Sequence, residues 1–324
     1  MKRLDYYWNS INIVSLILLP FSCLFCFISN IRSSLYRIKF FKAYKAPVPI
    51  IVVGNITVGG TGKTPLIIEL VKQLQSMGRK PGVISRGYGG NSSSWPQLVD
   101  KDITALQVGD EPKLIHERTA CPVSVGPNRQ QDIELLLNKH QCDVILSDDG
   151  LQHYALQRNI EIAVVDAQRK FGNGFYLPSG PLRESRSRLK KIDLVLLNGG
   201  EVNQLSFNLE PKYCEPINKP NEEAKALKEF AGKTVHAIAG IGHPARFFNM
   251  LRRLDIEVIE HEFVDHASYV QSDLLFNDEL PVLMTEKDAV KCATFDLVNH
   301  WSVPVNAIIS ESAQVQLDKL FKTI

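Results

Sequence analysis

The sequence is short of the features that mark several large classes of protein. Its 324 residues contain six cysteines, which neither repeat at zinc-ligand spacings nor reach the density of a disulfide scaffold. The formal net charge is +2, so composition gives no argument for a nucleic-acid partner, and we predict none. Internal repeats and low-complexity tracts are also absent. We therefore expect a protein with reduced thiols in a cytosolic compartment, whose 44% hydrophobic content can bury a large core.

The amino terminus carries the main anomaly of composition. Residues 11–28 read INIVSLILLPFSCLFCFI and contain no charged side chain, while basic residues flank the run on both sides. No small-residue cleavage site follows it, so we do not expect a cleaved signal peptide. Residues 1–45 are predicted to form a membrane-associated helix with a basic flank, which lies in the interface or, because of Pro20, crosses as a tilted or kinked span. We favour the interfacial helix, and a buried core helix is the remaining alternative.

After Pro47 the chain alternates between short apolar strands and helices. This order is typical of an α/β fold with a parallel sheet and flanking helices, as in P-loop NTPases, and we assign it to residues 46–216. A polar, proline-rich stretch at 210–221 predicts a linker or a pair of connecting strands, and residues 217–324 predict a smaller carboxy-terminal α/β lobe that closes a cleft. The predicted strands are 49–53, 82–85, 143–147, 160–166 and 193–197 in the first lobe, and 234–239, 257–263, 281–285 and 305–309 in the second.

A glycine-rich loop lies between the first predicted strand and a helix predicted over 64–77. Its sequence is Thr57-Val58-Gly59-Gly60-Thr61-Gly62-Lys63-Thr64. Glycines let backbone N–H groups converge on phosphate oxygens, Lys63 can neutralise the β- and γ-phosphates, and the Thr64 hydroxyl can ligate Mg²⁺. Thr57 replaces the first glycine of the usual GxxxxGK[ST] pattern. The loop predicts binding of ATP, against the alternative of a glycine-rich turn with a solvent-exposed lysine.

Two pairs of acids are candidates for the chemistry. Asp148 and Asp149 end an apolar strand, where a Walker B acid would bind Mg²⁺, although Asp-Asp-Gly is also a common turn. Asp110 and Glu111 begin a predicted helix with Pro112 in its first turn. Three roles are open for this second pair: it stabilises the helix dipole, it binds metal, or one of its acids takes the proton of an acceptor hydroxyl. The local sequence does not distinguish among these roles.

Basic residues and a histidine complete the set. Arg86 stands at a strand end in SRGYGG, where it suits an anion, and the basic stretch 181–191 is either a second such cluster or a solvated helix face. Together with the apolar amino terminus they indicate an anionic amphiphile at a membrane surface. In the second lobe, His266 follows Asp265 and could orient a carboxylate across the cleft, although a lone histidine is usually structural. The charged stretch 284–291 is interpreted as a helix start.

Taken together and in order, these motifs resemble one family. They are VGNITVGGTGKTP (53–65), SRGYGG (85–90), VGDEP (108–112), SDDGLQH (147–153), GNGFYLPSGPLRE (172–184), the pair at 265–266 and MTEKDAVK (284–291). Over nearly its whole length the chain resembles the tetraacyldisaccharide 4'-kinases, the lipid A 4'-kinases of Gram-negative bacteria.

The resemblance implies a reaction and a set of roles. A kinase of this kind transfers the γ-phosphate of ATP to the 4'-hydroxyl of a tetraacylated diglucosamine 1-phosphate, an anionic glycolipid, at the cytosolic face of the inner membrane, and we expect a monomer. Asp110 is then the catalytic aspartate and His266 its partner; the family often has DHH or DHY where this chain has Ala267 after the histidine. The remaining assignments are the loop Thr57–Thr64 for ATP, Thr64, Glu111, Asp148 and Asp149 for Mg²⁺, and Arg86, Arg183 and Glu184 for the substrate.

Two other functions fit part of the sequence. A membrane-associated nucleotide switch would hydrolyse ATP to free phosphate without a lipid acceptor. A kinase of a soluble sugar or nucleoside would leave the apolar amino terminus unexplained. Both use the same loop, so the acceptor distinguishes them from a lipid kinase.

Overall fold

Buried apolar runs form the strands of the larger of two sheets. The computed structural model describes residues 4–201, 203–218 and 223–324. The larger sheet has nine strands in the order β15-β8-β7-β6-β1-β5-β2-β4-β3. Its inner strands are parallel, and the edge strands β15 and β3 are antiparallel to their neighbours. The strands are β1 (Ile50–Gly54), β2 (Pro81–Ser85), β3 (Gln97–Leu98), β4 (Val123–Val125), β5 (Val144–Asp148), β6 (Ile160–Asp166), β7 (Leu194–Asn198), β8 (Ser206–Pro211) and β15 (Val305–Ile309).

Helices cover both faces of this sheet and bury its core. The first helix after β1 buries Leu66, Leu70 and Leu74 at helical spacing, and Gly78 follows its end with φ +79°. Ile133 and Leu136 of another helix belong to a separate buried cluster, which includes Ile50 and Val52 of β1. The helices of this lobe are α3 (Lys63–Ser76), α4 (Ala105–Val108), α5 (Asp110–Thr119), α6 (Arg129–Lys139) and α9 (Glu311–Phe321). The predicted α/β class with a parallel sheet is confirmed.

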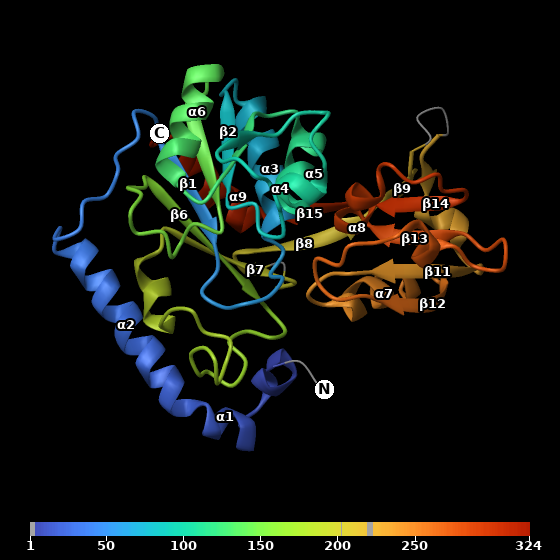
Figure 1. Cartoon of the computed structure of the whole chain (residues 1–324), viewed down its shortest axis with the longest axis horizontal. Helices are drawn as coiled ribbons and strands as arrows, with labels where there is room; N and C mark the ends of the chain where they lie inside the picture. The colour runs from blue at the N-terminus through green and yellow to red at the C-terminus, as the bar shows by residue number, and fades with distance from the viewer. Residues whose placement is uncertain (1–3, 202, 219–222) are drawn as a thin grey trace.

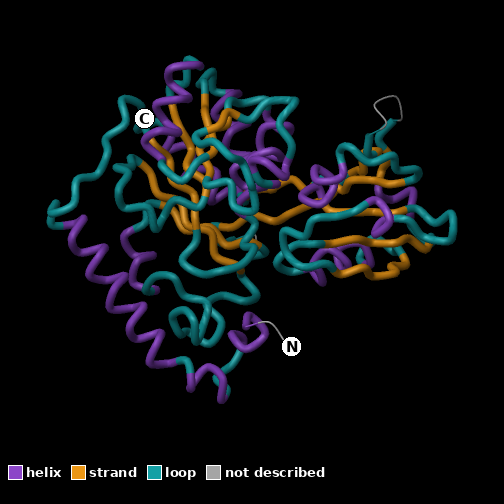
Figure 2. Tube along the Cα trace, viewed as in Figure 1, coloured by secondary structure: helices purple, strands orange, loops and turns teal. Residues whose placement is uncertain are grey.

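A smaller lobe is built on a six-stranded sheet in the order β10-β9-β14-β13-β11-β12. The chain enters it from β8 into β9 and leaves it from β14 into β15, so strands connect the two lobes (Figure 1, Figure 2). The stretch 210–221, predicted as a linker or a pair of connecting strands, contains the end of β8 and all of β9, and its residues 219–221 lie outside the described residues. Its elements are β9 (Tyr213–Pro216), β10 (Lys225–Ala226), β11 (Thr234–Ala239), α7 (Pro244–Arg252), β12 (Glu257–Glu262), β13 (Val282–Thr285), α8 (Glu286–Ala289) and β14 (His300–Val303).

One predicted strand lies in the other lobe. Residues 305–309 form β15, which pairs with β8 at the edge of the large sheet, and α9 then packs into the large core. The prediction that this strand belongs to the smaller lobe was therefore wrong. An apolar β-branched run can pair with any sheet that has a free edge, so the tertiary structure decides which strand it pairs with.

The apolar amino terminus forms helices that wrap the outside of the large lobe (Figure 1). The run divides into α1 (Ile13–Ile17) and α2 (Leu19–Arg37), because Pro20 stands in the first turn of α2, where its missing N–H costs nothing. Large side chains along these helices are exposed, so the alternative of a buried core helix is wrong; they include Ile13, Ile17, Phe21, Leu24 and Phe27. Within the described ranges, no helix is both long and apolar enough to cross a membrane.

Candidate active site

The glycine-rich loop sits at the carboxyl end of β1 and opens α3, as the sequence predicted. Gly59 and Gly62 have φ values of +105° and +87°, which L side chains rarely adopt. An added Cβ on Gly62 would lie 2.4 Å from the amide nitrogen of Asn198. That amide donates to the carbonyl of Thr61 at 2.9 Å and holds the loop from β7. The loop is therefore closely packed against β7, with its lysine at the start of a helix, which suits phosphate binding.

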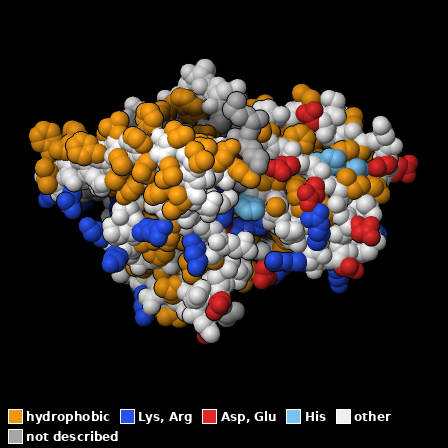
Figure 3. All heavy atoms as spheres, turned by 90° about the horizontal axis from the view of Figure 1, so that it is seen from below, with side chains coloured by type: hydrophobic (Ala, Val, Ile, Leu, Met, Phe, Trp, Pro, Cys, Tyr) orange, Lys and Arg blue, Asp and Glu red, His pale blue; other side chains and the backbone are white. Residues whose placement is uncertain are grey.

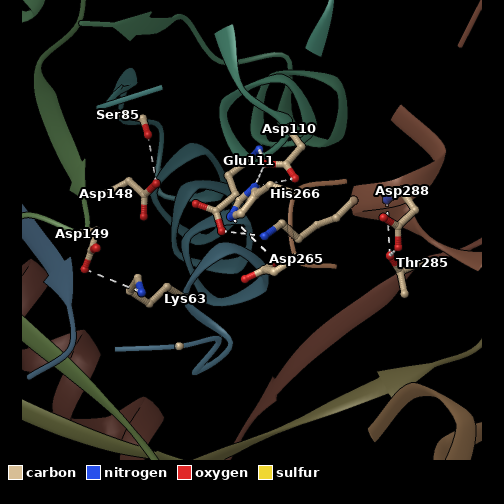
Figure 4. A network of polar contacts seen from close by, with 12 residues as sticks. Lys63, Ser85, Asp110, Glu111, Asp148, Asp149, Asp265, His266, Thr285 and Asp288 are labelled. Carbon is tan, nitrogen blue, oxygen red and sulfur yellow. Dashed lines mark hydrogen bonds and ion pairs between the residues drawn. The ribbon is translucent and has the colours of Figure 1, made fainter. Parts of the chain in front are cut away.

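Lys63 joins the loop to the acids after β5. Its ammonium group lies 3.6 Å from an oxygen of Asp149 (Figure 4). The same group donates to the side chain of Asn55 at 3.3 Å. Asp149 also accepts from Arg183 at 2.7 Å. Burial raises the pKa of Asp149, but the charges of Lys63 and Arg183 outweigh it and lower that pKa to about 2. Asp149 is thus held as a carboxylate between two cations.

Asp148 is in a different electrostatic environment from its neighbour. It is 2% exposed, and one oxygen accepts from the Ser85 hydroxyl at 3.0 Å while the other is buried without a hydrogen-bond partner. Burial, together with the charges of Glu111 and Asp149, raises the pKa of Asp148 to about 7. A cation beside this unpaired oxygen would relieve both the burial penalty and the repulsion.

The acid pair at the start of α5 meets the second lobe. Nδ1 of His266 lies 3.0 Å and 3.2 Å from the two oxygens of Asp110, which is 5% exposed. Lys287 donates to Glu111 at 2.8 Å. Burial opposes ionisation of Asp110, but the hydrogen bond from His266 and the charge of Lys287 lower its pKa to about 2. The hydrogen bond to Asp110 in turn raises the pKa of His266. Residues 156 positions apart thus form one acid and histidine pair across the two lobes.

The three residues predicted to bind the substrate differ in their contacts and burial. Arg183 reaches Asp149, as described, and so belongs to the cluster. Glu184 is 7% exposed and lies 3.4 Å from Arg188, its partner in an ion pair on the adjacent turn. Arg86 is exposed after β2. The roles of these three residues stay predictions.

Sequence reasoning missed several residues that shape the site. Asn55 binds Lys63, and Arg169 donates to the carbonyl of Gly60 at 2.9 Å. Asp166, at the end of β6, accepts from Arg246 of the second lobe at 2.9 Å and so joins the lobes beside the loop. Its position at a strand end was the available signal, since the carboxyl ends of parallel strands share one edge of a sheet.

A cavity and the acids define where ligands could bind. Between the lobes, a cavity of about 250 Å³ is lined partly by Thr57, Val58, Gly59, Gly242 and Asp265. In the described part of the chain, no three His, Cys, Asp or Glu side chains gather into a metal cage. Mg²⁺ in phosphotransferases commonly takes one or two carboxylates and completes its shell with phosphate oxygens and water. The unpaired oxygen of Asp148 could serve as one such ligand. The roles of Thr64, Glu111 and Asp149 at a magnesium ion stay predictions.

The chain is similar to known proteins in sequence and in fold. The chain is 50% identical over 323 residues to the tetraacyldisaccharide 4'-kinase of Actinobacillus pleuropneumoniae serotype 5b, covering 98% of each chain. It is 49% identical over 328 residues to the enzyme of that name from Pasteurella multocida, covering 98% of this chain and 99% of the relative. The solved structure of LpxK from Aquifex aeolicus in complex with ATP superposes with a TM-score of 0.79 at 28% identity, covering 96% of this chain and 99% of that one.

The family model for LpxK, the tetraacyldisaccharide-1-P 4'-kinase, matches residues 14–322. The predicted resemblance is therefore confirmed over almost the whole chain. The chain belongs to the tetraacyldisaccharide 4'-kinase family.

Proposed function

We propose that this chain uses Asp110 and His266 to activate the 4'-hydroxyl of a tetraacylated diglucosamine 1-phosphate for attack on the γ-phosphate of ATP. As a member of its family the chain is an ATP-dependent kinase of lipid A biosynthesis. The observation that supports the assignment is the 3.0 Å contact between His266 and Asp110, formed across the lobes in the same cluster as Lys63 and Glu111. The product of the proposed transfer is lipid IVA.

Phosphoryl transfer depends on position and charge more than on covalent chemistry. Lys63 lies where it can neutralise the β- and γ-phosphates, and the glycine loop can supply backbone donors. Thr64, Glu111 and Asp148, with Asp149 beside them, would hold Mg²⁺, which neutralises phosphate charge when bound. Asp110 is a carboxylate that can accept the hydroxyl proton, and His266 orients it through Nδ1.

Activity of an Asp110→Asn variant tests this assignment. We expect the rate of ³²P transfer from γ-labelled ATP to the disaccharide lipid to fall about 10²- to 10⁴-fold, because a general base contributes an effect of that size. Asp102→Asn, at an exposed aspartate of the same lobe, is the matched control. Undiminished transfer by Asp110→Asn would show that another group takes the proton.

The amino-terminal helices support a lipid acceptor at a membrane surface. An open groove of about 780 Å³ runs between α2 and residues 174–176, and its lining includes Leu19, Phe27 and Tyr176. Figure 3 shows hydrophobic side chains gathered over one part of the underside of the molecule, with Lys and Arg side chains beside them. Such a surface fits acyl chains together with anionic head groups. We place the protein at the cytoplasmic face of the inner membrane, held peripherally by these helices and acting as a monomer.

Flotation with liposomes of phosphatidylethanolamine and phosphatidylglycerol tests this placement. A variant with Phe21, Leu24 and Phe27 changed to serine should lose most of its bound fraction, because these side chains are 61%, 56% and 63% exposed. Serine substitutions at Leu275 and Val298, exposed apolar residues of the other lobe, form the matched control. Equal flotation of the two variants would exclude the helices as the membrane-binding element.

A further inference from the structure

The charged motif at 284–291 includes the short helix α8, and the proposed mechanism gives no role to Asp288 or Lys291 of this motif. Thr285 ends β13 and caps α8, accepting from the N–H of Asp288 at 3.3 Å and donating its hydroxyl to the same residue at 2.6 Å. Lys287 on this helix pairs with Glu111, whereas Asp288 faces its own lobe. Asp288 is therefore held in place by Thr285, the residue that caps the start of the same helix.

Asp288 is completely buried, and four donors satisfy its carboxylate. One oxygen accepts from the Tyr269 hydroxyl at 2.7 Å and from Lys291 at 2.9 Å. The other accepts from the N–H of Gly240 at 2.9 Å and from Thr285. These partners come from the end of β11, the end of β13, the loop that follows His266 and the turn after α8. A buried carboxylate with this many donors is costly to disturb, so it fixes these four segments relative to one another.

Lys291 extends this network to the proposed catalytic pair. Its side chain is 6% exposed, and its ammonium group donates to the carbonyl of Ala267 at 3.1 Å. The same nitrogen lies 3.9 Å from an oxygen of Asp110 and 5.0 Å from the centre of the Tyr269 ring. Lys291 therefore binds the residue directly after His266 and faces the carboxylate that His266 binds.

His266 itself needs such support. Its φ is +59°, a left-handed conformation that residues other than glycine seldom adopt. A strained backbone conformation of this kind persists only where the surrounding structure imposes it. The N–H of Ala267 bonds to the carbonyl of Val264 at 3.0 Å, and Lys291 binds the carbonyl on the other side of the same residue. The turn that positions the His266 imidazole is therefore held by its own backbone hydrogen bond and by the hydrogen bond from Lys291, which follows α8.

We propose that Asp288 and Lys291 are positioning residues that hold the turn of His266 against Asp110 and act on phosphate transfer through His266. The assignment rests on the proposed role of the Asp110 and His266 pair. A displacement of about 1 Å at a reacting group can cost about 100-fold in rate. We therefore expect Lys291→Met to lower kcat about 10- to 100-fold while KM for ATP stays within about threefold, because the contacts of Lys291 described above are on the acceptor side of the site.

A double-mutant cycle with His266→Ala tests the proposal. If Lys291 acts through His266, Lys291→Met should lower kcat less than about threefold in the His266→Ala background. An equal loss in both backgrounds would show that Lys291 acts independently, and an unchanged kcat in the wild-type background would exclude any role. A wild-type kcat for His266→Ala alone would instead remove the catalytic pair and this assignment with it.

Two further variants separate positioning from folding. Tyr269→Phe removes one hydrogen bond to Asp288 without a change of charge, and we expect a smaller loss of kcat that also disappears in the His266→Ala background. If circular dichroism shows that Lys291→Met does not fold, the double-mutant cycle is made with Tyr269→Phe and His266→Ala instead. Equal losses of kcat from Tyr269→Phe in the wild-type and His266→Ala backgrounds would then overturn the proposal. His300→Gln is the control, since His300 is also buried in this lobe but contacts the carbonyls of Val298 and Leu274. It should lower the melting temperature and leave kcat unchanged, and a comparable loss of kcat would show that general destabilisation explains the Lys291 effect.

Discussion

Substitution of Gly62 by alanine separates two physical constraints on the phosphate-binding loop. Gly62 has φ +87°, and a Cβ there would lie 2.4 Å from the amide nitrogen of Asn198. Two other glycines isolate these constraints. Gly78 has φ +79° with nothing within 4 Å of an added Cβ, and Gly60 has neither a positive φ nor a close neighbour. The three alanine variants therefore form a matched series.

The expected free energies follow from the geometry. A left-handed conformation costs a residue with a Cβ about 1–2 kcal/mol, so Gly78→Ala should destabilise the fold by that amount. Gly62→Ala adds the displacement of Asn198, which is 2% exposed and loses its hydrogen bond to Thr61. Overpacking and the lost bond add about 2–4 kcal/mol, giving a total of about 3–6 kcal/mol. Gly60→Ala should lie within about 1 kcal/mol of the wild type.

Urea denaturation without nucleotide, followed by circular dichroism, measures these differences. The predicted order of destabilisation is Gly62→Ala, then Gly78→Ala, then Gly60→Ala. A Gly62→Ala variant as stable as Gly78→Ala would refute the argument from Asn198. A Gly78→Ala variant as stable as Gly60→Ala would refute the argument from backbone conformation.

Three other measurements test particular features. Burial raises the pKa of Asp132 to about 7 although Arg129 opposes it, so the stability that this group contributes is complete below about pH 4 and is lost as the pH rises to 7. Asp132→Asn should therefore flatten the slope of unfolding free energy between pH 4 and 7 by up to about 1.4 kcal/mol per pH unit, and an unchanged slope would contradict this. Lys287→Met should lower kcat/KM about 10- to 100-fold, because it removes the cation that pairs with Glu111. Lys287→Arg keeps the charge and should retain most activity, so equal kcat/KM values for the two variants would contradict the role of charge. Iodoacetamide should label the exposed Cys23 in the native protein and the four buried cysteines only after unfolding, and mass spectrometry can identify the labelled residues. Labelling of a buried cysteine in the native protein would contradict the structure. The buried cysteines are Cys121, Cys142, Cys214 and Cys292, and burial raises the pKa of each thiol.

Much of the site was predictable because its signals are local. The strand, glycine loop and helix around Lys63 follow one another in the chain, and backbone geometry then places the lysine at the helix start. The same holds for Asp148 at the end of β5, since an apolar strand that stops at an acid puts the carboxylate at the sheet edge. The apolar run of residues 11–28 likewise announced a helix with a wide exposed apolar surface.

Other features could not be read locally, because they depend on which distant segments meet. Residues 305–309 form a strand as predicted, but their pairing with β8 required a free edge of the large sheet. Asp148 and Asp149 are adjacent and chemically identical, yet their pKa values shift to about 7 and about 2. Burial and unequal access to Lys63 and Arg183 produce that difference, and both arise only from packing.

The sequence by itself determined the kind of chemistry: a phosphate-binding loop, acids at strand ends and an apolar amino terminus, each set by residues close together in the chain. The tertiary structure decided which of these groups act together. It brought His266 to Asp110 across 156 residues and Lys287 to Glu111 across 176, and it enclosed Asp288 among four donors. Hydrogen bonds and ion pairs act over a few ångströms, so their partners are chosen by the packing of the two lobes, which no short stretch of sequence specifies.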